Sequence, residues 1–205
     1  MGRHASRGTR AKVFTTVAAV GAAAAVAGLG TFGTFTSTTS ASTAVSSGTV
    51  AIALGASGAA NRLSVGASGL VPGDTVQRAV DLSVTGDQDL AAVSLTTSAA
   101  PSSVLDADAT NGLQLVVDMC SVPWTESGTS PAYTYSCSGT SSTLVAARPV
   151  IGNNLAMAGV AVTSGSTSHL RVTLTLPTTA DNSFQGKSSV ISFEFTGTQR
   201  AGTSR

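Results

Sequence analysis

A stretch of alternating polarity between Leu70 and Leu95 constrains the fold of this chain more than any other segment. It opens with Pro72-Gly73-Asp74, where proline presets φ and glycine tolerates a positive φ, so a turn is expected. Apolar side chains then recur at every second position, which predicts half-buried antiparallel strands on either side of a turn at 85–87. The first apolar face carries Val76, Val80, Leu82 and Val84, with Arg78 as the single charged exception, and the second carries Ala91, Val93 and Leu95.

The same pattern recurs along the rest of the chain. Loops rich in Gly, Ser, Thr and Pro separate the short apolar runs, with long excursions at 96–111 and 121–138. No helical periodicity is evident after the N-terminus, so the fold class expected is all-β, an antiparallel jelly-roll-like β-sandwich. The further strands are expected around 50–54, 63–65, 113–119, 144–147, 160–162, 170–176 and 191–195.

The N-terminus has the layout of a secretory signal peptide. Residues 1–12 carry four basic residues and no acid, the run Val13–Leu29 is rich in Ala and Val, and small residues follow at 30–33. This order predicts a signal-peptide helix over residues 1–33 and a secreted or cell-surface protein. Because the apolar run is about as long as the shortest bilayer spans, an uncleaved anchor is the alternative.

Composition divides the chain beyond the predicted signal peptide into three segments, and its charge argues against nucleic acid as a partner. An uncharged, Thr-rich extended segment covers 34–47, the β-sandwich is expected over 48–200, and a short tail covers 201–205. Charged residues make up 10% of the chain and its net charge is +1. Without the four N-terminal basic residues, seven of the eleven remain against ten acidic ones, a net charge of −3. A basic nucleic-acid surface is therefore not expected.

The two cysteines predict one disulfide. Cys120 ends an expected strand, and Cys137 closes the excursion that follows it. In an exported chain with only two cysteines, pairing is the favoured interpretation, and two free thiols are the alternative. A metal site is not expected there, since no histidine or second cysteine pair lies nearby to complete a tetrahedral set.

The search for catalytic chemistry finds no convincing cluster. His169, the only histidine beyond the predicted signal, falls on the polar face of 170–176 and is interpreted as a solvated strand residue. The segment 106–112 resembles the front of a calcium loop, but its glycine is one place late for an EF-hand, and a polar turn is the better interpretation. Asp87 and Asp89 flank a tight turn and are expected to be solvated rather than an acid/base pair. No catalytic, cofactor or metal residue is therefore predicted.

Aromatic residues in the second excursion offer a binding surface as an alternative. Trp124 lies there with Tyr133 and Tyr135, and such rings can form a carbohydrate-binding patch. The commoner role is to cover a sheet end beneath a disulfide loop, so both interpretations stay open.

Several motifs together resemble the TasA/camelysin family of secreted bacterial matrix proteins. A Gly-Thr-Phe-Gly-Thr-Phe run ends the signal at 30–35, and Ser-Gly-Thr-Val at 47–50 resembles the family's first strand. Leu-Val-Pro-Gly-Asp at 70–74 resembles its turn motif. The segment 182–199, with Asn-Ser-Phe-Gln-Gly and the alternating Phe193 and Phe195, resembles its last strand. The landmarks run in the family's order from the signal to the last strand.

The resemblance implies a fold, a processing step and an assembly. It implies a jelly-roll domain, cleavage by a dedicated signal peptidase between Gly33 and Thr34, and polymerisation with copies of itself or related subunits into extracellular fibres. The donated strand would cover about 34–45, from Thr34, Phe35 and Thr36 to Val45. We therefore expect a non-enzymatic structural subunit without a cofactor. The alternatives are a secreted module for a glycan or surface partner, and the metalloendopeptidase activity attributed to some members.

Overall fold

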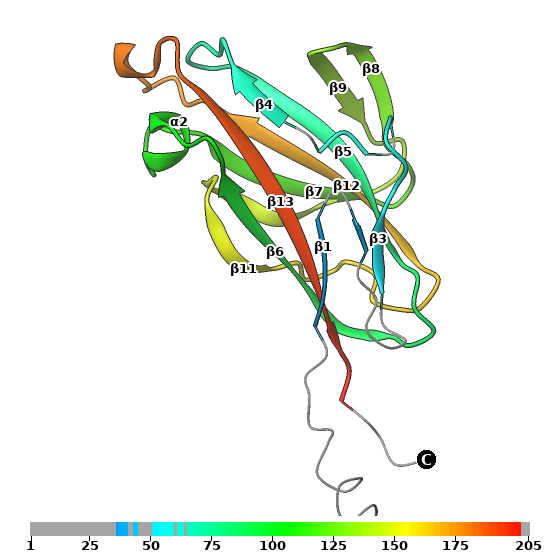
Figure 1. Cartoon of the computed structure of the whole chain (residues 1–205). Coiled ribbons are helices and arrows are strands. Elements are labelled where there is room, and N and C mark those ends of the chain that lie inside the picture. Colours follow the sequence, from blue (N-terminus) through cyan, green and yellow to red (C-terminus); the bar gives the residue numbers. More distant parts are fainter. Residues whose placement is uncertain (1–35, 41–42, 45–50, 60, 64, 202–205) are drawn as a thin grey trace, which may run out of the picture. The chain divides into compact units, whose positions relative to one another are not determined.

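The computed structural model describes residues 36–40, 43–44, 51–59, 61–63 and 65–201, so the predicted signal peptide lies outside the described residues. Two antiparallel sheets and a separate hairpin make up most of this part of the chain (Figure 1). The all-β prediction is confirmed, and the jelly-roll topology stays a prediction.

The first sheet has the strand order β11, β6, β13, β1 and β2, and β4 also pairs with β13. The second sheet has the order β10, β7, β12, β5 and β3, and β8 pairs with β9 alone. The first sheet contains β1 (Thr36–Ser40), β2 (Thr43–Ala44), β4 (Val65–Ser68), β6 (Leu90–Ala99), β11 (Gly152–Ala156) and β13 (Ser188–Gln199). The second contains β3 (Ile52–Leu54), β5 (Thr75–Val84), β7 (Gln114–Cys120), β10 (Ser141–Pro149) and β12 (Thr167–Thr175); the hairpin is β8 (Thr125–Thr129) with β9 (Ala132–Ser136).

The two sheets share one hydrophobic core. On β12, alternate side chains are buried and the intervening ones are half-buried, and β13 alternates between buried and exposed positions over most of its length. This is the period-two pattern that the sequence predicted. Aliphatic side chains supply most of the core, and its fully buried members include Ile52, Leu82, Leu95, Leu113, Leu115, Leu170, Leu174, Leu176, Ile191 and Phe195.

The predicted face of the strand after the second turn is wrong at its start. Ala91 is exposed, and Leu90 is buried in its place. The register of β6 against β13 shifts between the pairs Thr198–Ala92 and Gln199–Leu90, which places Ala91 in a bulge. An extra residue on one strand moves the side chains beyond it to the opposite face.

Three further segments differ from prediction. The expected loop 96–111 contains the last residues of β6 and a short helix, α2 (Val104–Ala107), and the expected excursion 121–138 contains the β8–β9 hairpin. Residues 160–162 form no strand, because Gly159 has a φ of 104° and Val160 donates back to Met157 in a turn. Val160 is nonetheless buried, since core contact does not require strand geometry.

A buried carboxylate ties α2 to β13. Asp106 is 8% exposed and accepts hydrogen bonds from the hydroxyls of Ser102 (2.6 Å) and Ser189 (2.5 Å) and from the backbone N–H of Ser103 (2.8 Å). Ser103 is the N-cap residue of α2: its hydroxyl accepts from the N–H of Leu105, and with Asp106 it forms a capping box. Burial alone would raise the pKa of Asp106, but the three donors together lower it below its ordinary value.

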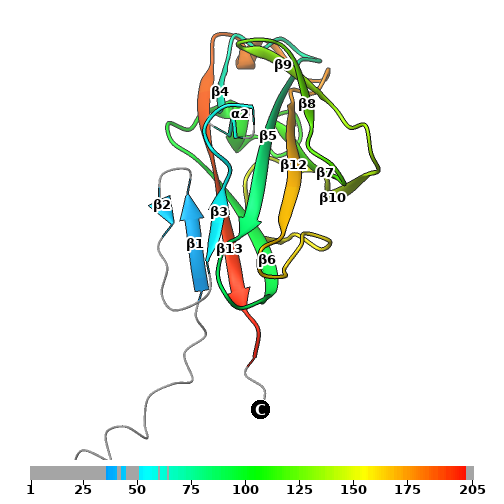
Figure 2. The ribbon, with the colours of Figure 1, turned by 90° about the vertical axis from the view of Figure 1, so that its right-hand side faces the viewer.

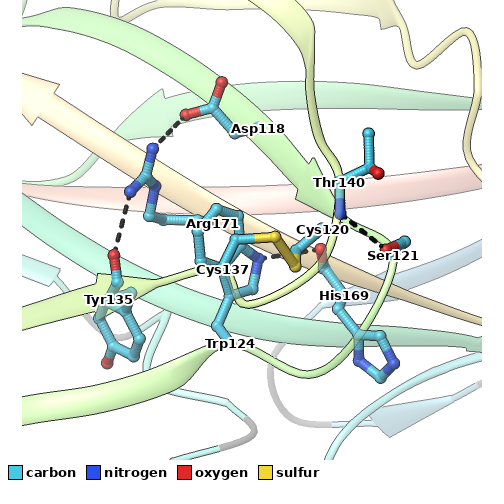
Figure 3. Close-up of a disulfide and its surroundings, with 9 residues drawn as sticks. All are labelled: Asp118, Cys120, Ser121, Trp124, Tyr135, Cys137, Thr140, His169 and Arg171. Carbon is cyan, nitrogen blue, oxygen red and sulfur yellow. Dashed lines mark hydrogen bonds and ion pairs between the residues drawn. A yellow bond between two sulfur atoms is a disulfide. The ribbon is translucent and has the colours of Figure 1, made fainter.

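The predicted disulfide is confirmed. Cys120 and Cys137 are bonded, with their Cα atoms 5.8 Å apart, and the bond closes the segment that holds the hairpin (Figure 3). Arg171 supports the same segment from β12: its guanidinium donates to Asp118 (2.7 Å) and to the Tyr135 carbonyl (3.2 Å). The hairpin is thus held to the second sheet by a covalent bond at its end and by hydrogen bonds along its side.

We predict that Asp106→Asn destabilises the fold by about 1–3 kcal/mol at neutral pH, because the donors around Asp106 lose a charged acceptor. A lowered folded-state pKa gives stability that is present above the unfolded-state pKa, about 3.9, and is lost as pH falls through the folded value. The difference from wild type should therefore shrink as the pH is lowered toward 3 in urea unfolding. Asp87→Asn, at an exposed turn, is the control, and a constant difference at every pH would contradict the prediction.

We predict that removing the disulfide in a Cys120→Ala/Cys137→Ala variant lowers the free energy of unfolding by about 3 kcal/mol, through the larger conformational freedom of the unfolded chain. Amide hydrogen exchange should also speed up in β8 and β9 while the centre of β12 keeps its protection. Wild-type protein reduced with a thiol is the matched comparison. Equal acceleration in both sheets would show that the bond supports the whole fold rather than the hairpin.

Candidate functional site

The predicted processing and donor residues fall mostly outside the described residues. Gly33, Thr34, Phe35 and Val45 are not described, and Thr36 is the first residue of β1. The cleavage position and the ends of the donor segment therefore stay predictions.

The described part of the donor segment pairs with the last strand of the same chain. β1 runs antiparallel to β13, with Cα partners from Thr36–Thr198 to Thr39–Phe195, and β2 lies on its outer side (Figure 2). β4 pairs with the other end of the same β13 edge, from Ser188 to Ile191. The expectation was a strand whose partner lies in a neighbouring molecule, whereas here β1 covers an edge of its own sheet.

The acidic residues that the sequence singled out serve turns and caps. Asp106 has the capping role described above, and Asp108 accepts from the N–H groups of Thr110 and Asn111 (2.8 and 2.9 Å). Asp89 accepts from the N–H of Ser164 at 2.8 Å, and Asp87 is exposed. In the calcium-like segment, Asp108 therefore binds its own turn, in agreement with the polar-turn interpretation, while Asp106 also binds Ser189 of β13.

His169 lies beside an acid rather than free in solvent. It is paired across the sheet with Asp81 of β5, and its Nδ1 is 2.7 Å from the Asp81 carboxylate. A catalytic zinc takes three protein ligands. Within the described ranges, no group of three His, Cys, Asp or Glu side chains is placed to hold a metal ion. The His169–Asp81 pair alone offers two donors and does not fit such a site.

The three aromatic residues of the second excursion do not form one patch. Trp124 is covered by the Arg171 guanidinium, 4.4 Å from the ring centroid, and its indole N–H donates to the His169 carbonyl. Tyr135 is 5% exposed and donates to Glu126 at 2.7 Å. These two residues therefore pack against β12, β5 and the hairpin rather than forming an open binding surface. Tyr133 is half-buried and faces elsewhere, into a cavity.

That cavity is a site that the sequence interpretation missed. It has a volume of about 330 Å³ and lies where the β8–β9 hairpin meets β5 and the loop before β4. Arg78 of β5 and Arg62 of the loop both line it, and both guanidiniums lie over the Tyr133 ring, at 5.4 and 4.2 Å from its centroid. The signal available in the sequence was Arg78, a charge on an otherwise apolar strand face.

Arg62, which lines the cavity, also belongs to a charged network. Arg62 donates to both oxygens of Glu126, from Nε (2.5 Å) and Nη2 (2.8 Å), and Tyr135 donates to one of them. The Arg62 hydrogen bonds are the main reason that the pKa of Glu126 is lowered, so Glu126 is a carboxylate at neutral pH. Burial, with the bond to Glu126, raises the pKa of Tyr135 to about 12, so Tyr135 keeps its proton.

Among the described helices, none has the length and apolar character needed to cross a membrane. This finding does not extend to the predicted signal peptide, which is not described.

Comparison with known proteins gives one match. The family described as camelysin metallo-endopeptidase matches residues 9–204, nearly the whole chain. No curated protein and no solved structure matches. The resemblance to the TasA/camelysin family is thereby confirmed, and the chain belongs to the camelysin family.

Proposed function

We propose that this chain is a secreted, non-enzymatic structural subunit that assembles into extracellular fibres by donating its N-terminal strand to the next copy. The observation that carries the proposal is the pairing of β1 with the edge of β13. Membership of the camelysin family supports a role of this general kind.

The edge that β1 covers is a ready acceptor for a strand. The half of β13 from Phe195 to Thr198 pairs with β6 on one side and with β1 on the other. Without β1, its backbone N–H and C=O groups on that side would need other partners, and an extended segment from another molecule can supply them. The other half of the edge stays covered by β4.

β1 is also suited to leave. It is five residues long, and its sequence Thr-Ser-Thr-Thr-Ser carries no charge. Because β1 of a second copy can make the same backbone pairs, exchange within and between molecules uses identical contacts. Head-to-tail exchange is heterologous, so it extends into a filament unless the rotation closes a ring.

The family description names a metallo-endopeptidase, which implies a metal. The residues of the described chain do not fit such a centre, because His169 and Asp81 lack a third ligand. This mismatch supports a structural rather than a catalytic role. Cleavage of casein that is lost on adding a chelator, and lost in His169→Ala, would contradict the non-enzymatic part of the proposal.

We predict that a Thr36→Cys/Thr198→Cys variant, beginning at Thr34, forms a ladder of disulfide-linked multimers when its fibres are oxidised. These two residues face each other across the β1–β13 pair, and directly opposed side chains of an antiparallel pair lie close enough to bridge. The measurement is a denaturing gel with and without reductant, beside electron micrographs of the same sample. Thr36→Cys alone is the control, and it should give no species larger than a dimer.

Two outcomes would overturn strand donation. Fibres that yield only an internally bridged monomer would show that β1 stays in its own chain. A variant lacking residues 34–45 that forms fibres as abundant as those of the mature protein would show that the segment is dispensable.

A further inference from the structure

The cavity between the β8–β9 hairpin and β5 has an excess of positive charge. Two guanidiniums, from Arg62 and Arg78, line it, and the nearest acid bound to either is Glu126. Two positive groups against one carboxylate leave a net charge of +1. An anionic group of charge −1 would balance the site.

Arg78 is the one of the two cations that is not bound directly to a carboxylate of the described chain. Its side chain belongs to a residue only 7% exposed, and it donates to the carbonyls of Gln77 (2.6 Å) and Pro131 (3.2 Å). In the described part of the chain, no carboxylate lies within 4.0 Å of its guanidinium. A buried cation that donates hydrogen bonds only to neutral acceptors is unfavourable, and a ligand carboxylate would supply a charged acceptor.

Arg62 and Tyr133 extend the same anion-binding surface. Glu126 engages Nε and Nη2 of Arg62, and among the described residues no acceptor is recorded for Nη1. Both guanidiniums lie over the Tyr133 ring, so the ring restrains the position of each of them. Planar guanidiniums fixed in this way match the geometry of a carboxylate, which accepts two parallel hydrogen bonds.

The rest of the lining suits a small ligand with hydroxyl groups. Ser57 and Ser130 are exposed at the mouth, while Leu63 is buried beneath them. For the Tyr133 hydroxyl, no hydrogen-bond partner is recorded within the described ranges. The volume of about 330 Å³ is at the lower end for ligand sites, which fits one sugar ring better than a longer chain.

We propose that this cavity binds a hexuronate, an acidic sugar, with its carboxylate between Arg78 and Arg62 and its hydroxyls at Ser57, Ser130 and Tyr133. The binding needs no assembly and is independent of the proposed strand donation. It also differs from the predicted aromatic patch, since Trp124 and Tyr135 are already covered and only Tyr133 takes part.

The test is a titration of the disulfide-bonded protein with D-glucuronate, D-glucose and N-acetylglutamate, each in a separate experiment at low ionic strength. Binding is measured by isothermal titration calorimetry and by changes in amide NMR chemical shifts. We expect glucuronate to bind at least tenfold more tightly than glucose, because only glucuronate pairs with the guanidiniums. It should also bind more tightly than N-acetylglutamate, which has carboxylates but no ring hydroxyls. Glucose within threefold of glucuronate would overturn carboxylate recognition, and tighter binding of N-acetylglutamate would assign the cavity to an acidic peptide instead.

Two variants with opposite expected effects on glucuronate binding test the role of the charges. Arg78→Gln should weaken glucuronate binding at least tenfold, whereas Glu126→Gln should strengthen it about threefold or more, because it removes the acid that competes for Arg62. A damaged fold can mimic the first result but not the second. Lys187→Gln, an exposed cation outside the cavity, removes the same charge as Arg78→Gln and should leave binding unchanged. Weaker binding in Glu126→Gln, equal to that in Arg78→Gln, would show that the network only supports the hairpin.

Discussion

Backbone hydrogen bonding along both edges of β13 is the constraint on which the first sheet depends. One edge pairs with β6 over nearly the whole strand, and the other is divided between β4 and β1. The side chains of β13 alternate between the core and solvent, so the strand contributes Ile191, Phe193 and Phe195 to the interior. β13 thus supplies both backbone partners and core side chains to the first sheet, and the described N-terminal strand β1 joins that sheet by pairing with it.

Period-two alternation is sufficient to predict the central strands. The apolar faces of β5, β12 and β13 follow from the sequence alone, because each strand is long enough to repeat the alternation several times, although Ala79 on the other face of β5 is buried as well. The turn at Pro72-Gly73 was equally predictable from its residue types, and Gly73 takes a positive φ of 97°, which glycine tolerates. The disulfide was predictable because the chain has two cysteines and its N-terminus predicts export.

The segments that were missed lack that signal, each for a physical reason. The β8–β9 hairpin has almost no buried face, since only Tyr135 in it is buried, so no apolar alternation marks it. α2 is one turn long, which is too short for a helical periodicity to appear in the sequence. Its main sequence signal is the Ser103–Asp106 capping box. The cavity could not be predicted because its residues come from three separated segments. Arg78 alone gave a hint, as a charge in an apolar series.

The position of β13 in the chain has a consequence for how the molecule is made. The strand at the middle of the first sheet is the last one synthesised, and its partners β1, β4 and β6 all precede it by many residues. Until residues 188–199 have emerged, these partners have no common neighbour, so the sheet cannot close progressively during translation. Contacts between residues far apart in sequence also slow folding once the chain is complete. The first sheet therefore closes only after its central strand, the last in chain order, has been synthesised.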